Sequence, residues 1–259
     1  MTAMAPEAPF LVALNLTQRC NLECAHCYLD AGTRRDGEKS ELGTAEVKSV
    51  IDNIAALSDE TMVVLTGGEP MMRRDLEELA SHATDKGLMV VVGSNGTLLD
   101  DARAKKLKAS GVQGIGISID SLDPAYHDEF RGQPGSWEKA MAGIDASRKN
   151  DLRFQIHFSV TNDNAHELDE MIAFARESGA FVFNVFFLVC TGRGEKVTNI
   201  SLETYEKVLA RVTEAAREET GLLVRAKCAP HFKRMALELD SSWPVTTAHG
   251  YEAGGCLAG

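Results

Sequence analysis

Residues 112–120, VQGIGISID, decide the fold of this 259-residue chain. In an extended strand successive side chains point to opposite faces. The three isoleucines of this stretch therefore share one face, and the other face carries small or polar residues, namely Gly114, Gly116, Ser118 and Asp120. Parallel strands that are covered by helices on both faces normally read as unbroken apolar runs. The alternation instead predicts a barrel strand with helices outside and a polar, ligand-holding lumen inside.

Five further runs have the length and the Val, Ile and Phe content of strands, at 11–16, 61–66, 88–94, 153–160 and 181–188. Apolar residues at helical spacing lie between or after them, in 47–57, 76–83, 165–178 and 202–219. Asp75, with Glu78 three residues later, resembles a capping box at the start of the second of these helices. Strand–helix alternation of this kind predicts a parallel α/β fold.

The side-chain alternation recurs in 11–16 and 153–160, which separates two parallel architectures. An edge strand of a doubly wound sheet would explain one such segment, but it does not account for three. The sequence therefore predicts a partial (β/α)6 TIM-like barrel, followed by the start of a cysteine-containing extension.

Composition and charge narrow the class of protein. The chain is 44% hydrophobic and 25% charged, has a net charge of −11 and contains no run of Lys or Arg. These values indicate a globular domain, and they argue against binding to nucleic acid or to an anionic membrane. The N-terminus lacks a basic segment, and no apolar run approaches the roughly 18–20 residues of a membrane span. We therefore expect a cytoplasmic protein whose six cysteines are free, catalytic or metal-bound.

Three of those cysteines occupy one short loop after the first strand, in the pattern CxxxCxxC from Cys20 through Cys24 to Cys27. A structural zinc site needs four ligands, and the position of His26 inside the loop suits a chelate poorly. An iron–sulfur cubane is commonly held by four thiolates, so three leave one iron open to a ligand. The stretches GGEP (67–70), SNG (94–96) and SIDS (118–121) follow the next three strands, at the edge where barrel active sites assemble.

This order of motifs resembles the radical S-adenosylmethionine (SAM) superfamily over residues 8–225. The resemblance implies a [4Fe–4S] cluster held by Cys20, Cys24 and Cys27, with SAM bound at the open iron. An electron from a reductant such as flavodoxin or ferredoxin then cleaves SAM, and the resulting 5′-deoxyadenosyl radical takes a hydrogen atom from a small-molecule substrate.

The resemblance also implies a set of SAM-binding residues: His26, Gly67, Gly68, Glu69, Pro70, Ser94, Asn95, Ser118, Asp120 and Arg131. The two glycines would let the methionyl group approach the backbone, Glu69 would accept hydrogen bonds from its amino group, and Pro70 would fix the turn. His26 takes the place of an aromatic ring against adenine, and Arg131 would pair with the carboxylate. The alternative for Ser94 and Ser118 is that they cap the following helices.

Three polar residues of the later strands are candidates for contact with substrate or adenine in the lumen: Gln155, His157 and Asn184. The alternative for His157 is a hydrogen-bonded histidine of the core without a functional role.

The C-terminal stretches 189–195, 224–234 and 251–259 resemble the SPASM-type subgroup, in which a cysteine-rich extension binds auxiliary iron–sulfur clusters. They look most like its haem-biosynthesis branch, of the haem d1 and sirohaem pathways, and like radical SAM proteins associated with tungsten oxidoreductases. We therefore expect a core domain at 8–225 and the start of an auxiliary-cluster extension at 226–259, with Cys256 as a cluster ligand. Because the chain stops at Gly259, we expect it to be truncated; a natural tail is the alternative.

The resemblance leaves three functions open. The first is a radical SAM enzyme that acts on the side chain of a tetrapyrrole, and the second is a maturase that modifies a peptide or protein. The few residues before Leu11 leave no room for a peptide-recognition domain, which argues against the maturase. The third is a non-catalytic iron–sulfur or zinc scaffold, in which Glu69 and the glycines before it would have no role.

Overall fold

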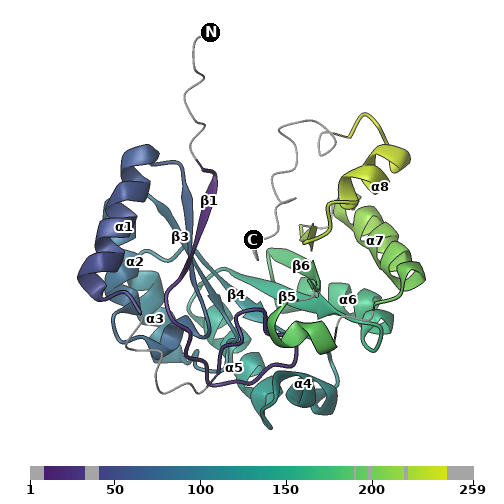
Figure 1. Ribbon diagram of the computed structural model, residues 1–259, viewed down its shortest axis with the longest axis horizontal. Coiled ribbons are helices and arrows are strands. Elements are labelled where there is room, and N and C mark those ends of the chain that lie inside the picture. The colour runs from purple at the N-terminus through teal and green to yellow at the C-terminus, as the bar shows by residue number, and fades with distance from the viewer. Residues whose placement is uncertain (1–8, 33–40, 190, 198–199, 219–220, 244–259) are drawn as a thin grey trace.

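A single parallel sheet organises the chain (Figure 1). The computed structural model describes residues 9–32, 41–189, 191–197, 200–218 and 221–243. Seven strands pair in chain order: β1 (Leu11–Asn15), β2 (Met62–Thr66), β3 (Met89–Ser94), β4 (Gly114–Ser118), β5 (Phe154–Val160), β6 (Val182–Phe187) and β7 (Leu223–Lys227). All six pairings are parallel. The sheet curls into a half-barrel whose edges are β1 and β7.

Helices connect consecutive strands and cover the outer face of the sheet (Figure 1). They are α1 (Thr44–Leu57), α2 (Leu76–Asp85), α3 (Asp101–Ala109), α4 (Pro124–Arg131), α5 (Ser136–Lys149), α6 (Leu168–Ser178) and α7 (Leu202–Arg217), and α8 (Phe232–Leu239) follows β7. Short 3₁₀ turns add η2 (Pro70–Met72), η3 (Ala165–Glu167) and η4 (Gly192–Lys196). The crossovers leave the carboxyl ends of all strands at one edge.

Burial follows the alternation seen in the sequence. Ile115, Ile117 and Ile119 are completely buried in the core on the helix side. On the lumen side, a side chain at Gly116 would collide with the His157 ring, because an added Cβ would lie 2.3 Å from its Cε1. The prediction of a partial parallel barrel is confirmed. The predicted count of six strands was wrong, since β7 adds a seventh.

Two local expectations concern the start of α2 and the end of the core domain. Asp75 precedes α2, but its side chain makes no cap hydrogen bond; it accepts instead from Arg73 and Thr44. The expected domain boundary after residue 225 lies inside β7, so the sheet continues past it. The domain division stays a prediction. Within the described residues, no helix is both long and apolar enough to cross a bilayer.

Candidate functional site

Three thiols are packed into the loop that leaves β1. Cys20 and Cys24 are buried and Cys27 is half-buried, and none of them is in a disulfide. With Leu22 and Ala31 they form a small apolar cluster apart from the main core. Burial raises the pKa of Cys20 to about 11 and also raises the pKa of Cys24, because a thiolate loses its hydration inside the protein. A metal that binds the thiolate form offsets this cost.

N–H donors already point at all three sulfur atoms. Sγ of Cys20 accepts from Leu22 N at 3.4 Å, Sγ of Cys27 from Ala31 N at 3.3 Å, and Sγ of Cys24 from the Arg131 guanidinium at 3.8 Å. Donors of this kind stabilise ligating thiolates and orient them.

The number of thiols in the loop matches a cluster with one open iron, since three protein thiolates leave the fourth iron of a cubane free. Among the residues that the structure describes, no three His, Cys, Asp or Glu side chains are grouped so that they could hold one metal ion. A cubane places each thiolate on a different iron, so its three ligands need not converge on one point. Donor-oriented thiols in one loop therefore fit an iron–sulfur cluster.

Arg193 lies far from this loop in the sequence but is hydrogen-bonded to it in the structure. The sequence alone did not indicate this residue as part of the site. Its guanidinium donates to the carbonyl oxygens of Cys24 at 2.9 Å and Ala31 at 2.8 Å, and it pairs with Asp30 at 2.8 Å. Its backbone N–H donates to Cys27 O at 3.1 Å. The stretch 189–195 thus contacts the cysteine loop; Cys190 lies outside the described residues.

We expect Arg193→Ala to weaken retention of the cluster, because the variant frees two carbonyl groups of the cysteine loop and removes an ion pair. Iron should dissociate several-fold faster in the presence of a chelator, followed by visible absorbance under anaerobic conditions. Arg193→Lys, which keeps the charge and loses the fork of donors, should fall between the variant and the wild type. Equal rates for all three proteins would contradict a positioning role.

The GGEP turn lies directly against the cysteine loop. Gly68 N donates to Thr17 O at 2.7 Å, and Glu69 N donates to Arg19 O at 2.8 Å. A Cβ on Gly67 would lie 2.5 Å from Thr17 O, and a Cβ on Gly68 would lie 2.3 Å from Arg19 O. Both glycines are therefore required for the close approach of this backbone, and their contact with SAM stays a prediction. Pro70 is the first residue of η2 and is buried.

Glu69 is completely buried and lies at the centre of a set of neutral donors. Its carboxylate accepts from Met71 N at 3.0 Å, from Asn95 N at 2.9 Å and from the Ser94 hydroxyl at 3.0 Å to each oxygen. Burial nevertheless raises the pKa of Glu69. A bound ammonium group would offset that cost of burial.

Asn95 connects the end of β3 to the cysteine loop. Its amide nitrogen donates to Asn21 Oδ1 at 2.9 Å and lies 3.8 Å from Cys20 Sγ. Ser118 lies on the lumen face of β4, and its hydroxyl donates to Ser94 O at 3.5 Å. The structure therefore brings these predicted residues together around the ends of β3 and β4.

Asp120 and Arg131 form one buried ion pair. The Arg131 Nε and Nη2 atoms lie 2.6 and 2.5 Å from Asp120 Oδ2, and Ser159 N donates to Oδ1 at 2.9 Å. Burial raises the pKa of Asp120, but the Arg131 charge, the nearby His26 and His127 and the Ser159 hydrogen bond together hold the pKa below its usual value. Arg131 is thus already neutralised by Asp120, so a SAM carboxylate would bind to the pair and not to an isolated cation.

His26 stacks on Phe130, with ring centroids 4.4 Å apart and an angle of 10° between the planes. One ring face is therefore covered, and the predicted contact with adenine would use the other. Burial lowers the pKa of His26 to about 4, so the ring is neutral. Its Nδ1 atom is buried without a partner among the described residues.

The three lumen candidates also lie together. Asn184 Nδ2 donates to Gln155 Oε1 at 2.8 Å, and His157 Nε2 lies 3.5 Å from the same oxygen. Burial, with the Lys227 charge adding to the effect, lowers the pKa of His157 to about 4. Cys256, the expected auxiliary ligand, lies outside the described residues.

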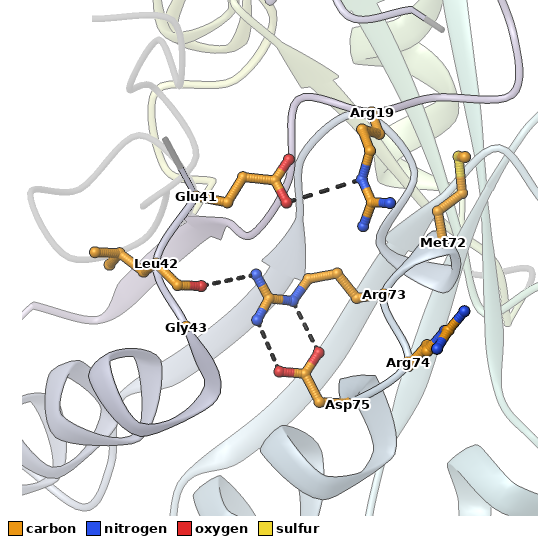
Figure 2. Close-up of a pocket in the computed structure, with 8 residues that line it drawn as sticks. All are labelled: Arg19, Glu41, Leu42, Gly43, Met72, Arg73, Arg74 and Asp75. Atoms are coloured by element: carbon orange, nitrogen blue, oxygen red, sulfur yellow. Dashed lines mark hydrogen bonds and ion pairs between the residues drawn. The ribbon is translucent and has the colours of Figure 1, made fainter. Parts of the chain in front are cut away.

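A pocket of about 610 Å³ opens beside η2, but none of its lining residues belongs to the predicted site (Figure 2). Its wall contains Arg73, which forms a two-point ion pair with Asp75 at 2.9 and 2.7 Å. The same guanidinium donates to Leu16 O at 2.9 Å and to Leu42 O at 3.0 Å. Arg73 thus connects the end of β1, the segment before α1 and the start of α2.

We expect Arg73→Ala to lower the free energy of unfolding by about 2–3 kcal/mol, because it leaves an aspartate and two carbonyl groups without their buried donor. Urea unfolding of the cluster-free protein measures this change. Arg74→Ala provides the matched control, since Arg74 is an exposed neighbour in the same pocket and its loss should change stability little. An equal effect of the two substitutions would contradict the role assigned to Arg73.

Known proteins are similar to this chain in both sequence and fold. Residues 14–175 match the Radical SAM superfamily. An AdoMet-dependent heme synthase of Methanosarcina barkeri is 40% identical over 264 residues, covering 100% of this chain and 74% of that protein. An Fe-coproporphyrin III synthase of the same organism is 35% identical over 211 residues, covering 80% of this chain and 52% of that one.

Among solved structures, Streptococcus suis SuiB bound to S-adenosylmethionine superimposes with a TM-score of 0.72 at 17% identity. The match covers 85% of this chain and 51% of SuiB. The chain therefore corresponds to about half to three quarters of the proteins it resembles.

Proposed function

The chain belongs to the radical SAM superfamily, and we propose that it is an enzyme that modifies a side chain of a tetrapyrrole. When bound, a [4Fe–4S] cluster and SAM together supply a 5′-deoxyadenosyl radical that takes a hydrogen atom from the substrate. The observation that carries the proposal is the set of three donor-oriented thiols in a loop directly against the GGEP turn.

Different residues of this chain would bind the cluster and SAM. Cys20, Cys24 and Cys27 would hold the cluster, and the neutral donors around Glu69 keep its carboxylate in place to receive the amino group of SAM. The remaining predicted residues, His26, Ser94, Asn95, Ser118, Asp120 and Arg131, surround the same carboxyl ends of the strands.

The substrate class rests on the relatives. A heme synthase that matches the whole chain at 40% identity and an Fe-coproporphyrin III synthase both carry names of tetrapyrrole chemistry, which favours a tetrapyrrole over a peptide. As part of the same proposal, flavodoxin or ferredoxin supplies the electron, and the segment 226–259 begins an auxiliary-cluster extension to which Cys256 contributes.

The test is formation of 5′-deoxyadenosine. The protein is reconstituted anaerobically with iron and sulfide, mixed with SAM and dithionite, and the product is measured by chromatography. Product from the wild type supports a radical SAM enzyme, whereas a normal cluster of about four irons without product would leave the scaffold reading. Faster product formation with an iron porphyrin than with a peptide supports the substrate class, and the reverse supports a maturase.

A further inference from the structure

The last three strands present a distinct surface to the lumen. In β7, Val224 and Ala226 are buried in the core against α7, so Arg225 and Lys227 lie on the opposite, lumen face. The register places Arg225 beside Asn184 of β6, and Asn184 in turn beside His157 of β5. Side chains of paired residues share a face in a parallel sheet. Polar and cationic groups therefore form a continuous row across three strands.

This lumen face of β5, β6 and β7 is positively charged, although the protein as a whole is acidic. The chain has 38 Asp and Glu against 27 Lys and Arg, yet β5, β6 and β7 contain no Asp or Glu at any position. Arg225 and Lys227 thus stand two residues apart on one face of β7 with no acid on the three strands to neutralise them. Two like charges at this spacing repel each other.

The surroundings of Lys227 disfavour its charged form. Its side chain is half-buried, and among the residues that the structure describes it has no carboxylate partner. Burial, with Arg225 adding to the effect, lowers the pKa of Lys227 to about 8. A buried ammonium group without a counter-ion is unfavourable unless an anion arrives to pair with it.

A second unsatisfied group lies in the same row. Asn184 is 3% exposed, and its Oδ1 atom is buried without a hydrogen-bond partner among the described residues, while its nitrogen donates to Gln155. Buried polar atoms are normally paired in native proteins. The register places Asn184 between His157 and Arg225 on the lumen face. The two cations indicate a site for an anionic group of a ligand, whereas the Asn184 oxygen, which can only accept, would take a hydrogen-bond donor of the same ligand.

We propose that Arg225 and Lys227 bind a carboxylate side chain of the substrate, while Asn184 Oδ1 accepts from a donor group elsewhere on it. The proposal rests on the proposed function, because it assigns a recognition site to the same lumen. The anion would lie on the β5–β7 half of the curled sheet, whereas the predicted cluster and SAM residues gather at the ends of β1–β4 (Figure 1). A tetrapyrrole with carboxylate side chains can form charge-assisted hydrogen bonds with these two cations.

The experiment measures binding without turnover. Metal-free coproporphyrin III, a porphyrin with propionate side chains, is titrated into the full chain without SAM and followed by its fluorescence, and its fully methylated ester is titrated in parallel. The wild type should bind the acid more tightly than the ester. The double variant Arg225→Gln/Lys227→Met should bind the acid about tenfold or more weakly and the ester unchanged.

Four further variants keep the result interpretable. Lys227→Arg retains the charge and should bind the acid as the wild type does. Lys207→Met removes an exposed lysine of α7 that pairs with Glu203, and it should have no effect. If the double variant does not fold, as judged by circular dichroism, the single variants Arg225→Gln and Lys227→Met replace it, each with a several-fold loss.

Equal affinity of the wild type for acid and ester, no binding of the acid, or unchanged affinity in the charge-removing variants would overturn the proposal. The formation of 5′-deoxyadenosine from SAM alone, measured separately, tests the proposed function. A chain that binds coproporphyrin through these two cations but makes no 5′-deoxyadenosine contradicts the enzyme and supports the carboxylate site. A chain that makes the product but binds without them contradicts the site alone.

Discussion

Cys24→Ala is expected to abolish the iron–sulfur cluster. The variant leaves two thiols in a loop where each of three would bind a different iron, and a cubane with two protein thiolates has two exposed irons. Iron per chain should fall from about four to near zero after anaerobic reconstitution, and the broad visible absorbance should disappear. Formation of 5′-deoxyadenosine should be lost with it.

The control for this experiment is Cys228→Ala, which removes a half-buried thiol outside the cysteine loop. This variant should keep the iron content and visible absorbance of the wild type. Full iron content in Cys24→Ala, with an unchanged spectrum, would show that a different side chain completes the site, and the assignment of Cys20, Cys24 and Cys27 would fail.

The sequence predicts the architecture because the relevant signals are local. Alternation in residues 112–120 separates Ile115 and Ile117 from Gly116 and Ser118, and the structure buries the isoleucines completely while it packs His157 over Gly116. The same alternation places His157 and Asn184 on one face of neighbouring strands. Such signals need no knowledge of distant contacts.

The seventh strand could not be recognised in the same way. β7 has Arg225 between its apolar residues and Lys227 at its end, which reads as a polar loop near Cys228. Its pairing with β6 and its burial under α7 make it a strand. Tertiary contacts thus override a weak local preference.

Long-range partners were also beyond the sequence. Arg193 contacts the loop of Cys24, which lies 169 residues away, and no spacing rule connects the two. The pairing of Asp120 with Arg131 was hidden for another reason: both were assigned to SAM separately, and only the geometry of α4 against β4 brings them together. The glycines of GRGE (192–195) are a local sign that this backbone approaches another segment closely. In the structure, a Cβ on Gly192 would lie 2.6 Å from Cys27 O.

Glu69→Gln is expected to weaken SAM binding by about tenfold or more, because it replaces a charge-assisted hydrogen bond to the amino group by a neutral one. Glutamine preserves the volume of the side chain in a fully buried position. Met71 N and Asn95 N donate to different oxygens of the carboxylate, so glutamine keeps one of these acceptors, whereas alanine loses both and a loss of affinity in Glu69→Ala would also reflect a collapsed turn. Equilibrium dialysis of radiolabelled SAM against the anaerobic, cluster-loaded protein measures the affinity.

Iron content separates a binding role from a structural one. Because the turn bearing Glu69 contacts the cysteine loop through backbone hydrogen bonds, which glutamine retains, the variant should hold as much iron as the wild type. Glu78→Gln on α2, an exposed carboxylate paired with Lys48, should leave both SAM affinity and iron unchanged. SAM affinity equal to that of the wild type in Glu69→Gln would show that the buried carboxylate serves only its neutral donors, and the amino group of SAM would then need a different partner.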